Sequence, residues 1–241
     1  MGVGFVENCA GNDGIEAAHW FRHPGYVKKE ISDSGFDIGL VYLNKPVKFC
    51  PYVQPALHLL ATREPSVGTE CQVSGWGLHD RSCTASEVLR TGRVRVLDEG
   101  KCRQRWRENI SEKFGAENLS GDFFERNVCV GRNRGSGAAA GQGDSGSALV
   151  CQDPATNKKV IHGVASTTID TEGDCCGKNS KCRGGPETPM IYTKVAHFRG
   201  WIEAEMRDVA ARKGCVATEK MGVSAWGAVA LLGFFVAVYF L

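Results

Sequence analysis

Most of the chain is built from short apolar or alternating runs that are separated by Gly, Pro and Asp. Runs of about four to eight residues with such boundaries are typical of β-strands. Helical spacing is clear only in residues 201–209, where acidic and basic residues recur four positions apart and Gly214 marks the end. A shorter helix is predicted over residues 98–107. Strands are predicted at residues 38–43, 71–76, 92–97, 148–151 and 160–165.

Glycine content and charge both indicate a folded, turn-rich protein. The 241 residues include 30 glycines and four methionines, and the formal net charge is +2. This near balance of charge argues against a protein held to nucleic acid or anionic lipid by bulk charge. Abundant Val, Leu, Ile and Phe exclude disorder. The length suffices for one large domain or two small ones with a sizeable core.

Eleven cysteines restrict the compartment in which the chain folds. Most are scattered, and only Cys175, Cys176 and Cys182 cluster, with no His close enough to complete a zinc site. The spacing therefore favours disulfides and an oxidising compartment. An odd count leaves at least one thiol unpaired or paired outside the chain. No metal and no cofactor is predicted.

The two ends of the chain differ in character. Residues 221–241 carry no charge, and residues 225–241 are nearly all apolar, without the polar face of a buried helix. At about 1.5 Å per residue the segment reaches about 30 Å, enough to span a bilayer. We expect a transmembrane helix or a GPI-addition signal, either of which attaches the protein to the extracellular side of a membrane. The first residues show no signal-peptide pattern, so an N-terminal part is expected to be missing.

A glycine-rich motif carries the candidate chemistry. In residues 141–151, GQGDSGSALVC, Ser145 is flanked by glycines that leave its hydroxyl little shielded. On a tight turn, the backbone N–H groups of Gly143 and Ser145 can converge on one oxygen, as an oxyanion hole requires. Taken alone, the motif also fits an ordinary β-turn.

Further motifs surround this segment in a characteristic order. They are His23-Pro-Gly-Tyr before Asp37-Ile-Gly-Leu, Cys71-x-x-x-Gly-Trp-Gly, the Gly-Asp-Ser-Gly motif, and Pro189-x-Ile-Tyr-Thr-Lys-Val before Gly200-Trp-Ile. Together they resemble the chymotrypsin/trypsin family of serine endopeptidases over about residues 1–206. The resemblance implies an all-β fold of two antiparallel β-barrels with a closing C-terminal helix. The first barrel is expected to be incomplete, and residues 207–220 to hold the end of the closing helix and a juxtamembrane spacer before a hydrophobic helix at 221–241.

The resemblance assigns roles to several residues of the expected cleft. Ser145 resembles the nucleophile, and Asp37 the buried carboxylate that orients the catalytic histidine. Gly143 and Ser145 supply the oxyanion N–H groups. Asp144 resembles the residue that receives the new N-terminus on activation, and Ser166 the serine that hydrogen-bonds the triad carboxylate. The implied disulfides are Cys71–Cys151 and Cys102–Cys129.

The catalytic base does not fit this assignment. The family places it in an Ala-Ala-His-Cys motif, well before the His-Pro segment. The nearest match here is His19, but it lies only four residues before His23, and Trp20 replaces the cysteine. We interpret residues 16–22 as a strand in which His19 is incidental. The chain as given is therefore expected to be inactive, either as part of a serine endopeptidase or as a non-catalytic homologue that binds or regulates.

The expected substrate pocket also departs from the family. Ala139 stands where trypsin-like enzymes carry an Asp, so a preference for Lys or Arg is not expected. Thr168 and Met190 stand where the family has glycines, which predicts a small or blocked pocket for protein or peptide substrates. Gln142 completes the pocket residues, and Gly141 replaces a family cysteine.

Two weaker signals lie between the second pair of cysteines. Asn109-Ile-Ser and Asn118-Leu-Ser are glycosylation sequons in what is expected to be one polar loop, in line with a secretory route. A basic run fits either a solvated helix face or an exosite for an acidic protein patch. It consists of Lys101, Arg103, Arg105 and Arg107.

Overall fold

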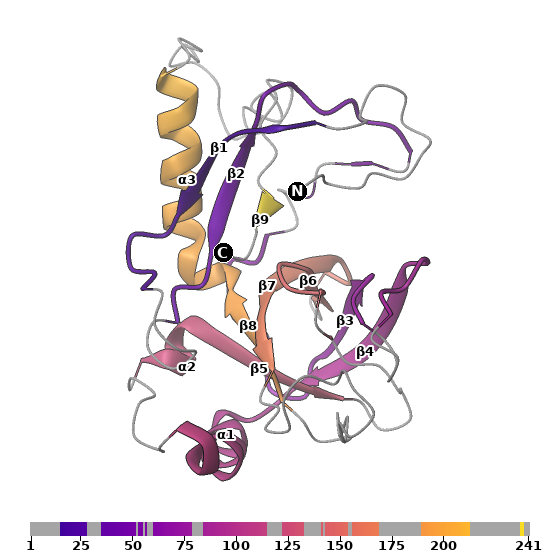
Figure 1. Ribbon diagram of the computed structural model, residues 1–241, viewed down its shortest axis with the longest axis vertical. Helices are drawn as coiled ribbons and strands as arrows, with labels where there is room; N and C mark the ends of the chain where they lie inside the picture. The colour runs from indigo at the N-terminus through magenta and orange to yellow at the C-terminus, as the bar shows by residue number, and fades with distance from the viewer. Residues whose placement is uncertain are drawn as a thin grey trace.

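The computed structural model contains two groups of strands, with a long C-terminal helix beside them (Figure 1). One group forms a closed barrel and the other an open sheet. The structure describes residues 15–27, 35–51, 53–54, 56, 60–78, 84–114, 122–132, 141, 143–153, 156–168, 189–212 and 237–238.

Six antiparallel strands close the barrel in the order β3–β4–β5–β8–β7–β6. Alternation along each strand decides which residues fill it. On β4, Val94 and Val96 are buried, whereas Arg93 and Arg95 are exposed. The strands are β3 (Glu70–Gly75), β4 (Arg90–Val96), β5 (Asn127–Arg132), β6 (Ala148–Gln152), β7 (Lys159–Thr168) and β8 (Met190–Lys194).

A disulfide joins two neighbouring strands of the barrel, one of which follows the Gly-Asp-Ser-Gly turn. Cys71 of β3 lies directly opposite Cys151 of β6, and the two cysteines are bonded. Both belong to the apolar barrel interior, together with Leu149 and Tyr192. The bond therefore fixes β6, which follows the Gly-Asp-Ser-Gly turn, to the neighbouring strand.

The N-terminal group is a three-stranded antiparallel sheet in the order β1–β2–β9. It consists of β1 (Ala17–Arg22), β2 (Gly39–Leu43) and β9 (Ala237–Val238). The expected helix at 221–241 is thus wrong at residues 237–238, which form a strand. Pairing there satisfies backbone groups that β2 would otherwise leave at a sheet edge. The rest of residues 221–241 lies outside the described residues.

Helix α3 (Val195–Arg212) joins the sheet to the barrel. It ends at Arg212, within the segment 207–220 in which the sequence places the helix end. Its buried residues recur every three or four positions and form one stripe. The stripe packs against Ile38 and Leu40 beside the sheet and against Val164 of the barrel. The stripe consists of Val195, Phe198, Ile202 and Met206.

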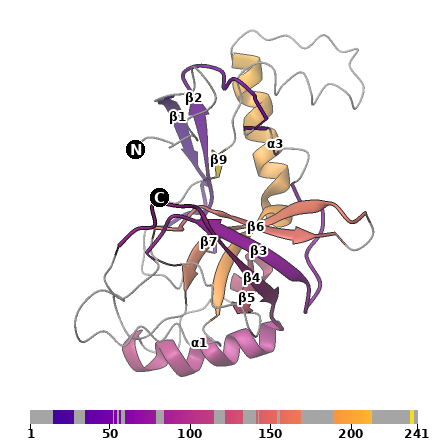
Figure 2. The ribbon, with the colours of Figure 1, turned by 90° about the vertical axis from the view of Figure 1, so that its right-hand side faces the viewer.

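Helix α1 (Glu99–Phe114) lies on the end of the barrel away from α3 (Figures 1 and 2). The Cys102–Cys129 disulfide ties it to β5, and Trp106 packs on the short helix α2 (Phe123–Arg126). The helix is longer than predicted, and Glu108, Glu112 and Lys113 after the predicted end favour helix. Asn109 therefore lies in a helix, and not in the expected polar loop. Asn118 lies outside the described residues.

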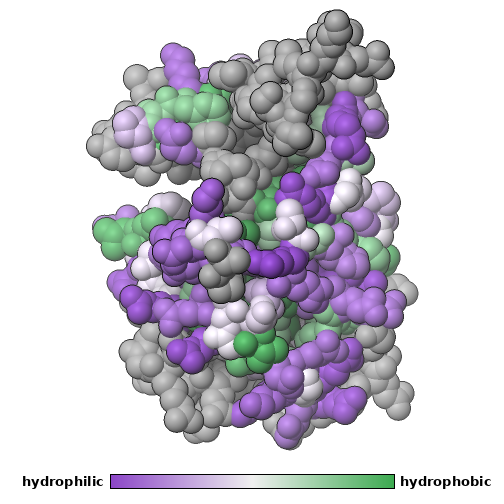
Figure 3. Space-filling model, turned by 180° about the vertical axis from the view of Figure 1, so that it is seen from behind, coloured by the Kyte–Doolittle hydropathy of each residue, from purple (hydrophilic) through white to green (hydrophobic). Residues whose placement is uncertain are grey.

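The fold class predicted from the sequence is confirmed for the closed barrel and the closing helix, and the described part of the first half is an open three-stranded sheet. Seen from behind, the described surface is mostly hydrophilic, with small separate apolar areas (Figure 3). Among the helices in the described ranges, none combines the length and the apolar character needed to cross a membrane.

Candidate active site

Ser145 is exposed on a tight turn that precedes β6. Two glycines shape the turn, because Gly143 has φ +95° and Gly146 has φ +82°, a region that residues with a Cβ rarely adopt. Two hydrogen bonds close it. The Asp144 N–H donates to the carbonyl of Gly141, and the Ser147 N–H donates to the carbonyl of Asp144, each at 3.0 Å. The hydroxyl of Ser145 is thus presented on a well-fixed backbone.

The backbone amides of this turn divide into two sets. Those of Asp144, Gly146 and Ser147 donate to carbonyls within the described part of the chain. The amides of Gly143 and Ser145, which the sequence assigns to an oxyanion hole, donate to no backbone carbonyl of the described residues. Preorganised N–H groups of this kind can stabilise developing negative charge on a substrate oxygen.

The Asp144 carboxylate anchors the turn to the β3–β4 side of the barrel. Its Oδ1 accepts from the Gly77 N–H at 2.7 Å, and its Oδ2 accepts from the Gly141 N–H at 2.8 Å. The approach is so close that a Cβ on Gly75 would stand 1.9 Å from Oδ1. A Cβ on Gly141 would likewise stand 2.5 Å from the carbonyl oxygen of Leu78. Glycine at position 141, where the family has cysteine, therefore matches the local packing.

Strand β7 connects the serine turn to the candidate carboxylate. Ala165 accepts from the Gly146 N–H at 3.0 Å and donates to the Ser147 carbonyl at 2.9 Å. The next residue is Ser166, whose hydroxyl donates to Oδ2 of Asp37 at 3.0 Å. Two consecutive residues of one strand therefore place residues 145 and 37 in one site.

Asp37 is also held through its backbone. The hydroxyl of Thr193 on β8, which is fully buried, donates to the Asp37 carbonyl at 2.8 Å. Sequence reasoning missed Thr193, although a polar residue within the otherwise apolar run of β8 is a signal that could have found it. Burial raises the pKa of the Asp37 carboxyl to about 7, and the Ser166 hydrogen bond opposes part of that rise.

The histidines in the described residues lie apart from this carboxyl or have other contacts. His19 is exposed on β1 and pairs with Tyr42, five residues beyond Asp37. At about 3.3 Å per residue, that register separates the two positions by about 16 Å along the strand. His23 stacks on Phe36 at 4.9 Å, and its Nδ1 accepts from the Gly25 N–H. Burial, followed by the neighbouring His197, lowers the pKa of His23.

Two of the predicted pocket residues, Met190 and Thr168, lie within the described ranges. Met190 begins β8, is 1% exposed and belongs to the apolar barrel interior. Tyr192, two residues further, is fully buried; burial and then the Asp144 charge raise the pKa of its hydroxyl. Thr168 ends β7. Ala139 and Gln142 lie outside the described residues.

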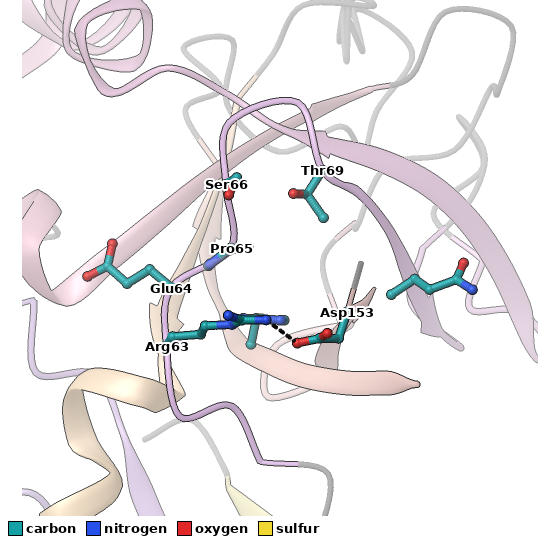
Figure 4. A pocket seen from close by; sticks show the side chains of 8 residues that line it. Arg63, Glu64, Pro65, Ser66, Thr69 and Asp153 are labelled. Carbon is teal, nitrogen blue, oxygen red and sulfur yellow. Dashed lines mark hydrogen bonds and ion pairs between the residues drawn. The ribbon is translucent and has the colours of Figure 1, made fainter. Parts of the chain in front are cut away.

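A separate hollow of about 420 Å³ lies on the barrel and contains none of the predicted site residues. An ion pair between Arg63 and Asp153, 2.9 Å long, borders it (Figure 4). Buried His162 also lines it, and burial lowers the pKa of that imidazole. Within the described ranges, no cluster of three His, Cys, Asp or Glu side chains is arranged to hold a metal ion.

Comparison with known proteins agrees with this geometry. The Trypsin family profile matches residues 4–202. Transmembrane protease serine 9 of Rattus norvegicus is 31% identical over 209 residues, which cover 86% of this chain and 17% of that protein. Kallikrein-8 of Mus musculus is 28% identical over 193 residues, covering 80% of this chain and 61% of the relative. The chain thus spans less than two thirds of the length of these relatives.

A solved structure shows the same arrangement. Neuropsin, a serine protease expressed in the limbic system of mouse brain, superposes with a TM-score of 0.60 and 28% sequence identity. The match covers 80% of this chain and 71% of the neuropsin chain. The chain belongs to the Trypsin family.

The contact between Gly75 and Asp144 can be tested by adding one methyl group. In Gly75→Ala, the new Cβ should displace the Asp144 carboxylate and weaken its two hydrogen bonds to backbone amides. We expect a loss of about 3 kcal/mol in the free energy of unfolding, measured by urea titration. Gly200→Ala is the matched control, because a Cβ there meets nothing within 4 Å and helix α3 favours alanine. Equal stability of Gly75→Ala and the parent chain would contradict the packing.

Proposed function

We propose that this chain carries the site of a serine endopeptidase, in which Ser145 attacks the peptide carbonyl. The Gly143 and Ser145 amides would hold the developing oxyanion, and an acyl-enzyme would form at Ser145. Asp37, fixed by Ser166, would orient an imidazole that takes the serine proton. No cofactor is required for this chemistry.

The observation that carries this proposal is that Ala165 and Ser166, adjacent on β7, bind the serine turn and Asp37 respectively. A single strand binds the serine turn with backbone hydrogen bonds and binds the Asp37 carboxyl with the next side chain. An ordinary β-turn would need no such buried acid. Membership of the Trypsin family and the serine proteases among its relatives support the same reaction.

The chain by itself is proposed to be inactive, because none of its six histidines occupies the family position of the base. Loss of a triad member costs about 10⁴–10⁶ in kcat. The competing function is that of a non-catalytic homologue that keeps the cleft for binding. The exposed position of His19 and the aromatic packing of His23 favour this second candidate.

Substrates are proposed to be proteins or peptides with a small side chain before the scissile bond. Ala139 offers no negative charge to a Lys or Arg side chain. Met190 fills space inside the barrel, where the family has glycine. Both features oppose trypsin-like specificity.

The site of action is proposed to be the extracellular face of a membrane. Disulfides at Cys71–Cys151 and Cys102–Cys129 favour an oxidising compartment. One relative is named as a transmembrane protease. The uncharged segment 221–241 would supply the attachment, for which residues 237–238 would leave their pairing with β2. The Asn109 and Asn118 sequons would be sites of glycosylation.

Labelling of Ser145 by a fluorophosphonate probe measures whether its hydroxyl is activated as a nucleophile. The purified chain is expected to show no labelling above that of Ser145→Ala, because an unassisted serine hydroxyl is a weak nucleophile. Mass spectrometry of the intact protein gives the labelled fraction. Stoichiometric labelling that Ser145→Ala abolishes would contradict inactivity. Loss of such labelling in His19→Ala, but not in His79→Ala, would make His19 the base.

Membrane attachment can be tested by deletion of residues 221–241. Fused to a cleavable signal peptide and expressed in cells, the shortened chain should be recovered in the medium, while the full chain stays with the membrane fraction. Immunoblots of the two fractions measure the ratio. Equal retention of both forms would contradict attachment through this segment. Release of the full chain by a phosphatidylinositol-specific phospholipase would select a GPI anchor over a retained span.

A further inference from the structure

Positive charge is concentrated in one stretch that the proposed reaction does not use. Residues 90–107 contain seven Arg and Lys residues and two acidic residues, a net charge of +5, whereas the whole chain carries +2. The remainder of the chain is therefore slightly acidic. The stretch covers β4 and the first half of α1, all within the described residues.

The outward face of β4 presents two arginines side by side. Arg93 and Arg95 have side chains that are 73% and 54% exposed, while Val94 between them is fully buried. Leu97, the next residue on the same face by alternation, packs into the apolar cluster beneath α1. Strand β4 therefore leads through Leu97 to the start of α1, and Arg95 lies four residues before the helix.

Helix α1 carries further basic side chains on both sides of the stripe of residues that it buries. Cys102 and Trp106 face the barrel, so Lys101 and Arg105 lie along one side of the stripe and Arg107 along the other. Lys101 and Arg107 are exposed. Arg103 lies over the ring of Phe124 and pairs with Glu99. We define the basic face as Arg93, Arg95, Lys101, Arg105 and Arg107.

A carboxylate already occupies part of this face. Glu70 of β3 lies opposite Arg95 in the sheet register. Its two carboxylate oxygens stand 3.6 Å from the guanidinium of Arg93 and 3.9 Å from that of Arg95. Its side chain is 45% exposed, so these ion pairs are long and solvated, and such pairs contribute little to stability. A carboxylate from another molecule could therefore replace or join it.

We propose that the basic face is a docking site for an extended acidic segment of a partner polypeptide. Every second side chain of an extended peptide lies on one side at a repeat of about 7 Å, which is also the repeat of Arg93 and Arg95 on β4. Guanidinium groups pair with carboxylates in two-point geometry. The basic face contains none of the candidate active-site residues, so the proposal holds whether or not the chain is catalytic.

The proposal is tested with a fluorescein-labelled ten-residue peptide of alternating Glu and Thr, titrated with the full chain at about 20 mM salt. Fluorescence anisotropy should show binding that weakens as salt rises. The peptide with Gln in place of Glu should not bind. Reversal of both arginines, Arg93→Glu with Arg95→Glu, should raise the dissociation constant about tenfold or more. Glu70→Gln should lower it about threefold, because it removes the competing carboxylate.

Two controls keep the result interpretable. Lys158→Glu with Lys159→Glu makes the same change in net charge at the exposed β6–β7 hairpin and should alter the dissociation constant less than twofold. Arg93→Gln with Arg95→Gln, checked by circular dichroism, separates lost binding from lost folding. Equal effects of the Arg and Lys pairs, or equal binding of the Glu and Gln peptides, would overturn the proposal. The proposal would also be overturned if the chain bound a sulfated oligosaccharide at this face and did not bind the acidic peptide.

Discussion

The hydrogen bond from Ser166 to Asp37 is the interaction on which the candidate site depends. It links strand β7 of the closed barrel to the residue that lies two positions before β2 of the open sheet. Ala165, one residue before Ser166, fixes the serine turn through two backbone hydrogen bonds. A shift of β7 by one residue would face Ser166 away from Asp37, because side chains alternate along a strand. The register of one strand therefore sets the geometry of the whole site.

Apolar packing behind this link makes it rigid. Ile38, next to Asp37, packs with Val164 of β7 and with the buried stripe of α3. The hydroxyl of Thr193 also donates to the carbonyl of Asp37. Burial of this kind disfavours the charged form of the carboxyl, which is why its pKa rises. The same burial suits a carboxyl that is to hold an imidazole by a strong hydrogen bond.

The sequence predicts much of this arrangement because its signals are local. Turn glycines around Ser145 and alternation along β4 each reflect the conformation of a few residues, and both agree with the structure. The contact of Gly75 with Asp144 and the hydrogen bond of Thr193 were not predicted. They join residues far apart in the chain, and a local pattern, such as a polar residue in β8, does not name the partner. The strand at residues 237–238 differs from the expected helix for the same reason, since pairing with β2 decides it.

The titration of Asp37 tests the central claim most directly. The Cγ carbon of Asp37, followed by NMR between pH 3 and 10 in a selectively labelled chain, should titrate near pH 7. Ser166→Ala should raise that midpoint further, since the hydrogen bond that favours the carboxylate is lost. Because the raised pKa makes the folded chain bind the extra proton, stability should fall as pH rises from about 4 to about 7, and less so in Asp37→Asn. A midpoint near 4 that Ser166→Ala leaves unchanged would contradict the account.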